Sequence, residues 1–311
     1  MRFCMVGAGA VGGYYGAKLA RAGHEVTLLA RGRHLEAIRA RGLTVRGPLG
    51  DFTVEVGATD APGEVPPVDV AVFAVKCYSN ADALPLLRAV MGSGKGTVAL
   101  TLQNGVDSAD EIAAMAGADR VLAGSTYIAA AVAEPGVIVQ TGMHRRIVFG
   151  EPFGATARVS SRVEAVHAAF AASDIVSEPV ADARIPIWEK FCYLAPFAAF
   201  TGAARLPIGP LWSSPDVRRA FLDGVKEVEA VAHAEGVAVP ADLVARIVTY
   251  LDSLDPTTRS SLLIDLQQGK PIEVEALVGA AVRRGRRCGV PTPILSALYA
   301  VLQPHALGGR R

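Results

Sequence analysis

Length, composition and charge exclude several classes of protein. The chain has 311 residues, 51% of them hydrophobic, which is enough for about two domains with sizeable cores. Its 31 basic and 30 acidic residues give a net charge of +1, so no global field attracts nucleic acid or an anionic membrane. The cysteines are scattered without CxxC pairs or zinc-ligand spacing, which is typical of small buried residues in a reducing compartment: Cys4, Cys77, Cys192 and Cys288.

The chain begins with RFCMVGAG and lacks the charged region, long apolar run and cleavage site of a signal peptide. No apolar run reaches the ~18 residues that a membrane span requires. The longest candidate, ALVGAAV, is followed at once by RRGRR. We therefore expect a cytoplasmic protein without metal, membrane or nucleic-acid partners.

The first 180 residues alternate short apolar runs with helical stretches. RFCMVGAG predicts a strand, VGGYYGAKLARAG a helix closed by Gly23, and HEVTLLA a second strand before a short helix around HLEAIRARG. LTVRG and DFTVEV flank GPLG, which predicts a hairpin. VDVAVFAV and GTVALTLQNG are nearly continuously apolar, as in parallel strands buried on both faces, and YIAAAV, GVIVQTG and RRIVFGE predict three further strands that extend the sheet. Strands alternating with helices predict a parallel sheet covered on both sides.

Strand signals stop after about residue 182. Ser214 and Pro215 mark a helix start that continues to Gly236, and further helices are expected in ADLVARIVTYLDSL, TTRSSLLIDLQQG and IEVEALVGAAVRRGRRCG. The sequence therefore predicts a Rossmann-type α/β dinucleotide-binding domain over residues 1–182, followed by an all-α domain over 183–311.

The hexapeptide GAGAVG fits the G-x-G-x-x-G pattern and stands between a predicted strand and a predicted helix. In that setting the first glycine permits a tight turn, the second lets the backbone approach a pyrophosphate, and the third allows close helix–strand packing. The alternative is a purely structural turn. The residues expected to bind the cofactor are Gly7, Ala8, Gly9, Ala10, Val11 and Gly12.

The end of the second predicted strand indicates which dinucleotide binds. An NAD enzyme usually has Asp or Glu there, whereas this chain has Ala30 followed by Arg31. A guanidinium can pair with a 2′-phosphate that a carboxylate would repel. We therefore expect NADP(H), read by Arg31; the alternative is a solvated arginine loop.

Two polar residues follow later predicted strands. Lys76 comes after VDVAVFAV, and Asn104 comes after GTVALTLQ. Because ligands of open α/β sheets bind beyond the carboxyl ends of the strands, both are expected at the cofactor crevice.

Lys190 lies in WEKFCYLAPFAAF, where its neighbours at helical spacing are mostly apolar. A lysine is almost never fully buried unless it is paired. Lys190 therefore either extends to water along its alkyl chain or lines a pocket and takes part in chemistry.

With these motifs the chain resembles the ketopantoate reductase (2-dehydropantoate 2-reductase) family nearly end to end. The resemblance rests on GxGxxG, Arg31, Val75–Lys76, QNG at 103–105, WEKF, SSLLIDLQQGKPIEVEALVG and GVPTP. It implies that Lys190 is the general acid, that Ser261 and Glu273 contact substrate, and that Asp265 belongs to the same region. Glu273 is also expected to act in catalysis and beside the cofactor, and Asn104 to bind substrate as well as cofactor.

One departure concerns the substrate. The family pattern has asparagines four and eight residues after the catalytic lysine, where this chain has Leu194 and Ala198. A site built to hydrogen-bond a hydroxyl discriminates against analogues that lack it, so this wall is expected to be more apolar.

The expected function is NADPH-dependent reduction of a 2-oxo acid, with 2-dehydropantoate as the first substrate and pantothenate biosynthesis as the pathway that the resemblance implies. The alternatives are a paralogue acting on a more apolar oxo acid and a non-catalytic NADPH sensor. A sensor would need neither Lys190 nor Glu273. The sequence is compatible with a homodimer.

Overall fold

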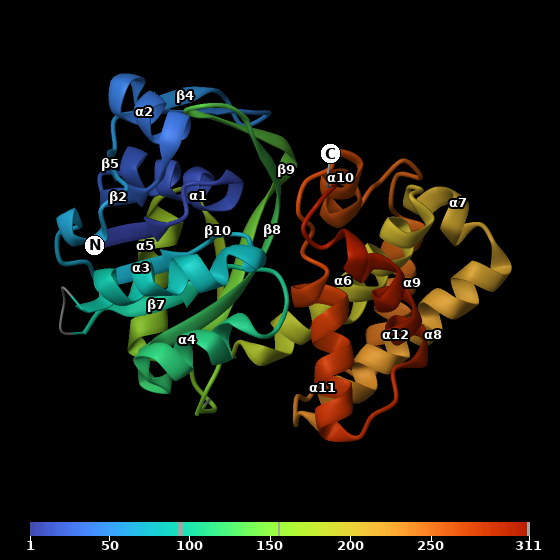
Figure 1. Ribbon diagram of the computed structural model, residues 1–311. Helices are drawn as coiled ribbons and strands as arrows, with labels where there is room; N and C mark the ends of the chain where they lie inside the picture. The colour runs from blue at the N-terminus through green and yellow to red at the C-terminus, as the bar shows by residue number, and fades with distance from the viewer. Residues whose placement is uncertain (93–95, 155, 310–311) are drawn as a thin grey trace. The chain divides into compact units, whose positions relative to one another are not determined.

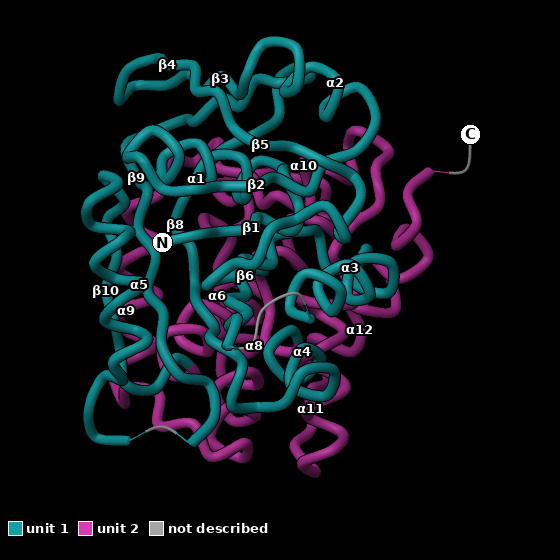
Figure 2. Tube along the Cα trace, turned by 90° about the vertical axis from the view of Figure 1, so that its left-hand side faces the viewer, with its two compact units in different colours: residues 1–103, 108–183 teal, residues 104–107, 184–311 magenta. Residues whose placement is uncertain are grey.

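A computed structural model describes residues 1–92, 96–154 and 156–309 (Figure 1). It divides into two compact units (Figure 2). Unit 1 comprises residues 1–103 and 108–183, and unit 2 comprises residues 104–107 and 184–311. The short segment 104–107 thus belongs to unit 2 although both flanking segments belong to unit 1.

Unit 1 is built on one mixed sheet, to which ten strands contribute within the described residues, in the order β4-β3-β9-β8-β7-β6-β1-β2-β5 with β10 beside β9. The central strands β2, β1, β6, β7 and β8 pair in parallel, while β3–β4 and β8–β9 pair antiparallel. The strands are β1 (Arg2–Val6), β2 (Glu25–Leu29), β3 (Leu43–Arg46), β4 (Phe52–Val54), β5 (Gly57–Thr59), β6 (Val70–Phe73), β7 (Val98–Thr101), β8 (Val121–Glu134), β9 (Val137–Glu151) and β10 (Val176–Asp182).

Helices cover both faces of this sheet. Successive side chains of a strand point to opposite sides, so the apolar strands present side chains to be buried on each face. In β1, Phe3 and Met5 join the core formed with α1 and α5, whereas Cys4 and Val6 join the core formed with α3 and α4. The helical elements of unit 1 are α1 (Ala10–Arg21), α2 (Gly32–Arg41), η1 (Pro62–Glu64), η2 (Cys77–Ser79), α3 (Asn80–Gly92), α4 (Ser108–Ala116), η3 (Ala118–Arg120) and α5 (Ser161–Ala172). The predicted doubly covered α/β fold is confirmed.

The prediction of two separate strands in GVIVQTG and RRIVFGE was wrong, because both lie in the single strand β9. Its partner residues shift from Ile128–Arg145 to Ala129–Thr141, so β9 carries extra residues at this point. Gly142 has φ +78° within this irregularity. A bulge thus absorbs the residues that looked like a break between strands.

Unit 2 is helical and centred on α6, whose residues contribute to the core from several sides. A helix that is apolar all round is typical of a buried position. The elements of unit 2 are α6 (Arg184–Ala204), α7 (Ile208–Trp212), α8 (Pro215–Ala234), α9 (Leu243–Asp252), α10 (Ser261–Gln267), η4 (Glu275–Gly279), α11 (Ala280–Cys288), α12 (Pro293–Leu302) and η5 (Gln303–His305).

The helix expected over IEVEALVGAAVRRGRRCG begins differently from the prediction. The segment η4 is a π-helical turn, in which the Gly279 N–H donates to the Val274 carbonyl at 2.8 Å, five residues back instead of four. The turn is therefore wider than α-helix, a distortion found often at functional sites. Glu273 lies two residues before the start of this turn.

None of the helices in the described part of the chain is both long and apolar enough to cross a membrane. The same residues contain no cluster of three or more His, Cys, Asp or Glu side chains arranged to bind a metal ion.

Candidate active site

The glycine-rich loop connects β1 to α1 in unit 1. Gly7 has φ +105°, a conformation that favours glycine, and a Cβ at Gly12 would lie 2.0 Å from the Gly7 carbonyl oxygen. The turn from strand to helix is therefore as tight as the motif predicts. A Cβ at Gly9 would meet nothing within 4 Å, so the backbone there borders open space at the N-terminus of α1. Open space beside helix amides fits a pyrophosphate.

His34 holds this loop in place, a role that the sequence did not indicate. One ring nitrogen, Nε2, lies 2.8 Å from the carbonyl oxygen of Ala8, and the other, Nδ1, lies 3.0 Å from the backbone nitrogen of Gly136. Since Gly136 N–H can only donate and Ala8 C=O can only accept, the ring is neutral with its proton on Nε2. Only the closeness of His34 to Arg31 in the sequence could have drawn attention to it.

Arg31 lies two residues after the end of β2, the strand beside β1, and directly precedes α2 in an extended conformation. Its side chain is exposed, as is that of Arg33. His34 thus connects α2, which begins directly after Arg31, to the glycine-rich loop.

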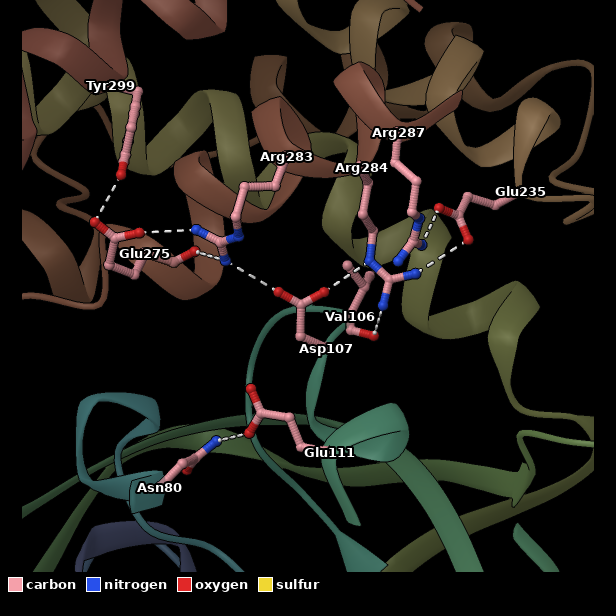
Figure 3. A network of polar contacts seen from close by, with 10 residues as sticks. All are labelled: Asn80, Val106, Asp107, Glu111, Glu235, Glu275, Arg283, Arg284, Arg287 and Tyr299. Carbon is pink, nitrogen blue, oxygen red and sulfur yellow. Dashed lines mark hydrogen bonds and ion pairs between the residues drawn. The ribbon is translucent and has the colours of Figure 1, made fainter. Parts of the chain in front are cut away.

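The ends of β6 and β7 are linked by side chains in unit 1. Gln103 Nε2 donates to the Val75 carbonyl at 2.8 Å and to Asn80 Oδ1 at 2.7 Å. Asn80 Nδ2 donates to Glu111 Oε2 at 2.6 Å (Figure 3). The glutamine of the QNG motif therefore fixes the two strand ends. Lys76 is exposed immediately beyond Val75.

Lys190 lies on α6 in unit 2 and donates a hydrogen bond from Nζ to Asn104 Oδ1 at 2.9 Å. Burial lowers the pKa of Lys190 from 10.5 to about 8, while the negative charge of Glu273 opposes this shift. Glu273 itself is only 6% exposed. In unit 2, two other predicted site residues, Asn104 and Glu273, therefore interact with the ammonium group of Lys190.

Two adjacent serines at the start of α10 have different surroundings. Ser260 is buried, accepts from the Leu263 N–H at 3.0 Å and lies 2.7 Å from the Thr201 hydroxyl. It caps the helix. Ser261, the residue predicted to bind substrate, is exposed, and Asp265 is partly buried one turn further on.

Leu194 and Ala198 are 9% and 1% exposed and belong to the core of unit 2. They follow Lys190 at spacings of one and two helical turns, so the three residues share one face of α6. Apolar packing thus occupies the positions where the family pattern has asparagines.

The α/β unit contains a glycine-rich loop at the start of a helix, and the helical unit contains a partly buried lysine of lowered pKa. An ammonium with a pKa near neutrality can donate a proton to an oxygen that gains negative charge. These features define a nucleotide-dependent oxidoreductase that acts on a carbonyl or hydroxyl group.

Comparison with known proteins identifies the family. The family described as "Ketopantoate reductase PanE/ApbA" matches residues 3–153, and its C-terminal counterpart matches residues 182–306. The 2-dehydropantoate 2-reductase of Halobacterium salinarum is 35% identical over 301 residues, covering 96% of both chains. The chain belongs to the ketopantoate reductase family and is an oxidoreductase of the 2-dehydropantoate 2-reductase type, acting on CH–OH groups.

Solved structures agree with this assignment. A PanE/ApbA family ketopantoate reductase from Ralstonia eutropha JMP134 is 33% identical with a TM-score of 0.88, covering 98% of each chain. The 2-dehydropantoate 2-reductase from Geobacter metallireducens GS-15 is 31% identical with a TM-score of 0.89, covering 98% of this chain and 99% of that one. The predicted family and fold class are confirmed.

Proposed function

We propose that the protein reduces 2-dehydropantoate to pantoate with NADPH, in pantothenate biosynthesis. The observation that carries this proposal is the hydrogen bond from Lys190 to Asn104, at a lysine whose pKa burial lowers to about 8. A sensor that only bound the dinucleotide would not need a desolvated ammonium. The relatives named 2-dehydropantoate 2-reductase support the choice of substrate.

Most of the residues proposed to hold the cofactor lie in unit 1, within the proposed domain 1–182; Asn104 and Glu273 belong to unit 2. Gly7–Gly12 and the N-terminus of α1 would bind the pyrophosphate, and Arg31 would pair with the 2′-phosphate. Lys76 is proposed to line the same region, and Asn104 and Glu273 to lie beside the cofactor. When bound, the nicotinamide supplies the hydride.

The chemistry of the chain itself is assigned to unit 2, within the proposed domain 183–311. Lys190 donates its proton to the keto oxygen as negative charge develops there, and Asn104 orients the ammonium. Glu273 stabilises the charged form of Lys190 and is available to a substrate hydroxyl. Ser261 is proposed to hydrogen-bond the substrate, since its side chain is exposed.

A second candidate substrate is a 2-oxo acid with a plain branched alkyl group. It is favoured by Leu194 and Ala198, which replace two amides with packed apolar side chains. Its reduction would be the same reaction with the same proton donor as for 2-dehydropantoate. The two substrates differ only in the group attached to the keto acid.

The test is the rate of NADPH oxidation with a panel of 2-oxo acids that includes 2-dehydropantoate and its analogues without the hydroxyl. We expect turnover with 2-dehydropantoate and no sharp preference over the branched alkyl acids. A preference of several thousand-fold would show that other residues replace the asparagines. Binding of NADPH without turnover of any oxo acid would favour the sensor.

A further inference from the structure

An ion-pair network in unit 2 holds the loop that carries Asn104 (Figure 3). Asp107, three residues after Asn104, accepts a hydrogen bond at Oδ1 from Arg284 Nε at 2.7 Å and at Oδ2 from Arg283 at 3.1 Å. The neighbouring carbonyl of Val106 accepts from Arg284 at 3.0 Å. Two consecutive loop residues are thus fixed by adjacent arginines of α11.

Arg284 holds its hydrogen-bond partners in fixed positions because its charge is buried. The residue is 6% exposed, and its guanidinium also donates to Glu235 at 3.1 Å. A buried charge must keep its partners, and a planar guanidinium requires them in fixed directions. The guanidinium also lies 5.9 Å from the centre of the Trp188 ring, two residues before Lys190 on α6. Arg284 therefore contacts both the Asn104 loop and the helical turn of Lys190.

The network extends to the segment that carries Glu273. Arg283 donates to the Glu275 carboxylate and to its carbonyl, both at 2.8 Å, and the Tyr299 hydroxyl donates to the same carboxylate at 2.7 Å. Glu275 follows Glu273 by two residues and begins η4. Figure 3 shows Asp107 between the two arginines, with Glu275 on one side and Glu235 on the other.

The backbone of the loop also lies directly against η4. Gly105 has φ +93°, and a Cβ there would lie 2.5 Å from the carbonyl oxygen of Ala276. Only glycine permits this conformation together with so close an approach. The position of the loop is therefore fixed by the backbone contact of Gly105, next to Asn104, and by the ion pairs of Asp107.

We propose that Asp107 is a positioning residue for the reaction: through Arg284 and Arg283 it holds Asn104 so that the amide oxygen accepts a hydrogen bond from Lys190. This inference rests on the proposed function, in which Lys190 is the proton donor. The hydrogen bond favours the charged ammonium and directs its other protons. Errors of about 1 Å in such an arrangement can cost on the order of a hundredfold in rate.

The first test does not depend on activity. The chain has six lysines, so the Lys190 signal can be assigned in a lysine-labelled sample by its loss in Lys190→Ala, and its pKa measured by NMR titration. We expect Asp107→Asn and Asn104→Ala each to lower the pKa of Lys190, and the double variant to match Asn104→Ala alone. A further fall in the double variant would show that Asp107 acts directly through its charge and would overturn the proposal, as would an unchanged pKa in Asp107→Asn.

The second test measures turnover with 2-dehydropantoate in the same variants. We expect Asp107→Asn to lower kcat about tenfold and to add nothing to the loss in Asn104→Ala. The matched control is Arg287→Ala, which removes the 2.5 Å contact to Glu235 but touches neither loop residue, and should keep wild-type kcat. Equal losses in Asp107→Asn and Arg287→Ala would indicate general destabilisation and refute positioning. A wild-type protein without reductase activity would refute the proposed function while the titration still tests the loop.

Discussion

At the scale of single residues, Lys190 shows how burial prepares a side chain for proton transfer. Desolvation lowers its pKa from 10.5 to about 8, against the attraction of Glu273. Asn104 can accept a hydrogen bond but cannot neutralise the charge, so it orients the ammonium without fixing it in an ion pair. The ammonium can therefore lose its proton within the physiological range.

The lowered pKa predicts the pH dependence of the reaction. If Lys190 is the proton donor, as proposed, reduction needs the protonated ammonium, so kcat should be constant below about pH 8 and fall as the pH rises through that value. An unfolded lysine keeps its proton to about pH 10.4, so this group makes the free energy of unfolding rise with pH between the two values. The measurement is kcat against pH at saturating NADPH. A rate that stays level up to about pH 10 would exclude Lys190 as the titrating donor.

Arg31 should decide the choice of dinucleotide. We expect tighter binding of NADPH than of NADH, and Arg31→Ala should weaken NADPH binding about ten- to a hundredfold while barely changing NADH binding, because a charge-assisted contact contributes roughly 1.5–3 kcal/mol. Fluorescence titration of both cofactors checks this. The exposed neighbour Arg33 supplies the control variant, Arg33→Ala. Equal affinities for the two cofactors in the unmodified protein would refute the assignment.

His34 should affect cofactor binding through the phosphate loop. In His34→Gln the amide nitrogen can still donate to Ala8, whereas in His34→Asn the amide oxygen can only replace the contact to Gly136. We expect the Kd for NADPH to stay within about twofold in the first variant and to rise about three- to tenfold in the second. Isothermal titration calorimetry measures both. Matched losses in the two variants would mean that His34 does not act through Ala8.

At the scale of elements, two substitutions in the turn from β1 to α1 should affect different quantities, one the affinity for NADPH and the other the stability of the fold. Gly9→Ala should leave the thermal unfolding midpoint unchanged, since its Cβ would meet no protein atom within 4 Å, yet weaken NADPH binding about tenfold or more. Gly12→Ala should destabilise the fold by roughly 1–3 kcal/mol, because its Cβ would lie 2.0 Å from the Gly7 carbonyl. Calorimetry with and without NADPH distinguishes them. Undiminished NADPH affinity in Gly9→Ala would place the pyrophosphate elsewhere.

The elements also show what the sequence could predict. Nearly continuous apolar runs predicted the central strands β6 and β7, because burial on both faces leaves a local signature. The unbroken β9 and the π-helical η4 left none, since a bulge and one shifted hydrogen bond depend on partners distant in the chain. The resemblance to a family indicated Lys190. The structure adds the ion pairs that hold the loop of Asn104, the residue that accepts the hydrogen bond from Lys190. Arg284 and Asp107 are 177 positions apart, and no local pattern joins them.

At the scale of the whole molecule, the proposed tasks are divided between the two units. The phosphate loop, Arg31 and His34 lie in unit 1, whereas Lys190, Glu273 and the loop of Asn104 lie in unit 2. A variant of Arg31 should therefore change NADPH affinity, and a variant of Lys190 should change the rate of reduction. This separation lets binding and chemistry be tested on the same protein.

The most direct measurement is made on Lys190→Ala, after circular dichroism shows that the variant is folded. NADPH affinity and the single-turnover rate of 2-dehydropantoate reduction are measured on the same sample. If Lys190 is the proton donor, the rate should fall by about a hundredfold or more while the Kd for NADPH stays unchanged. If the lysine only packs along its alkyl chain, the variant should lose a little stability and reduce substrate at a near-normal rate. That second result would contradict the proposed mechanism.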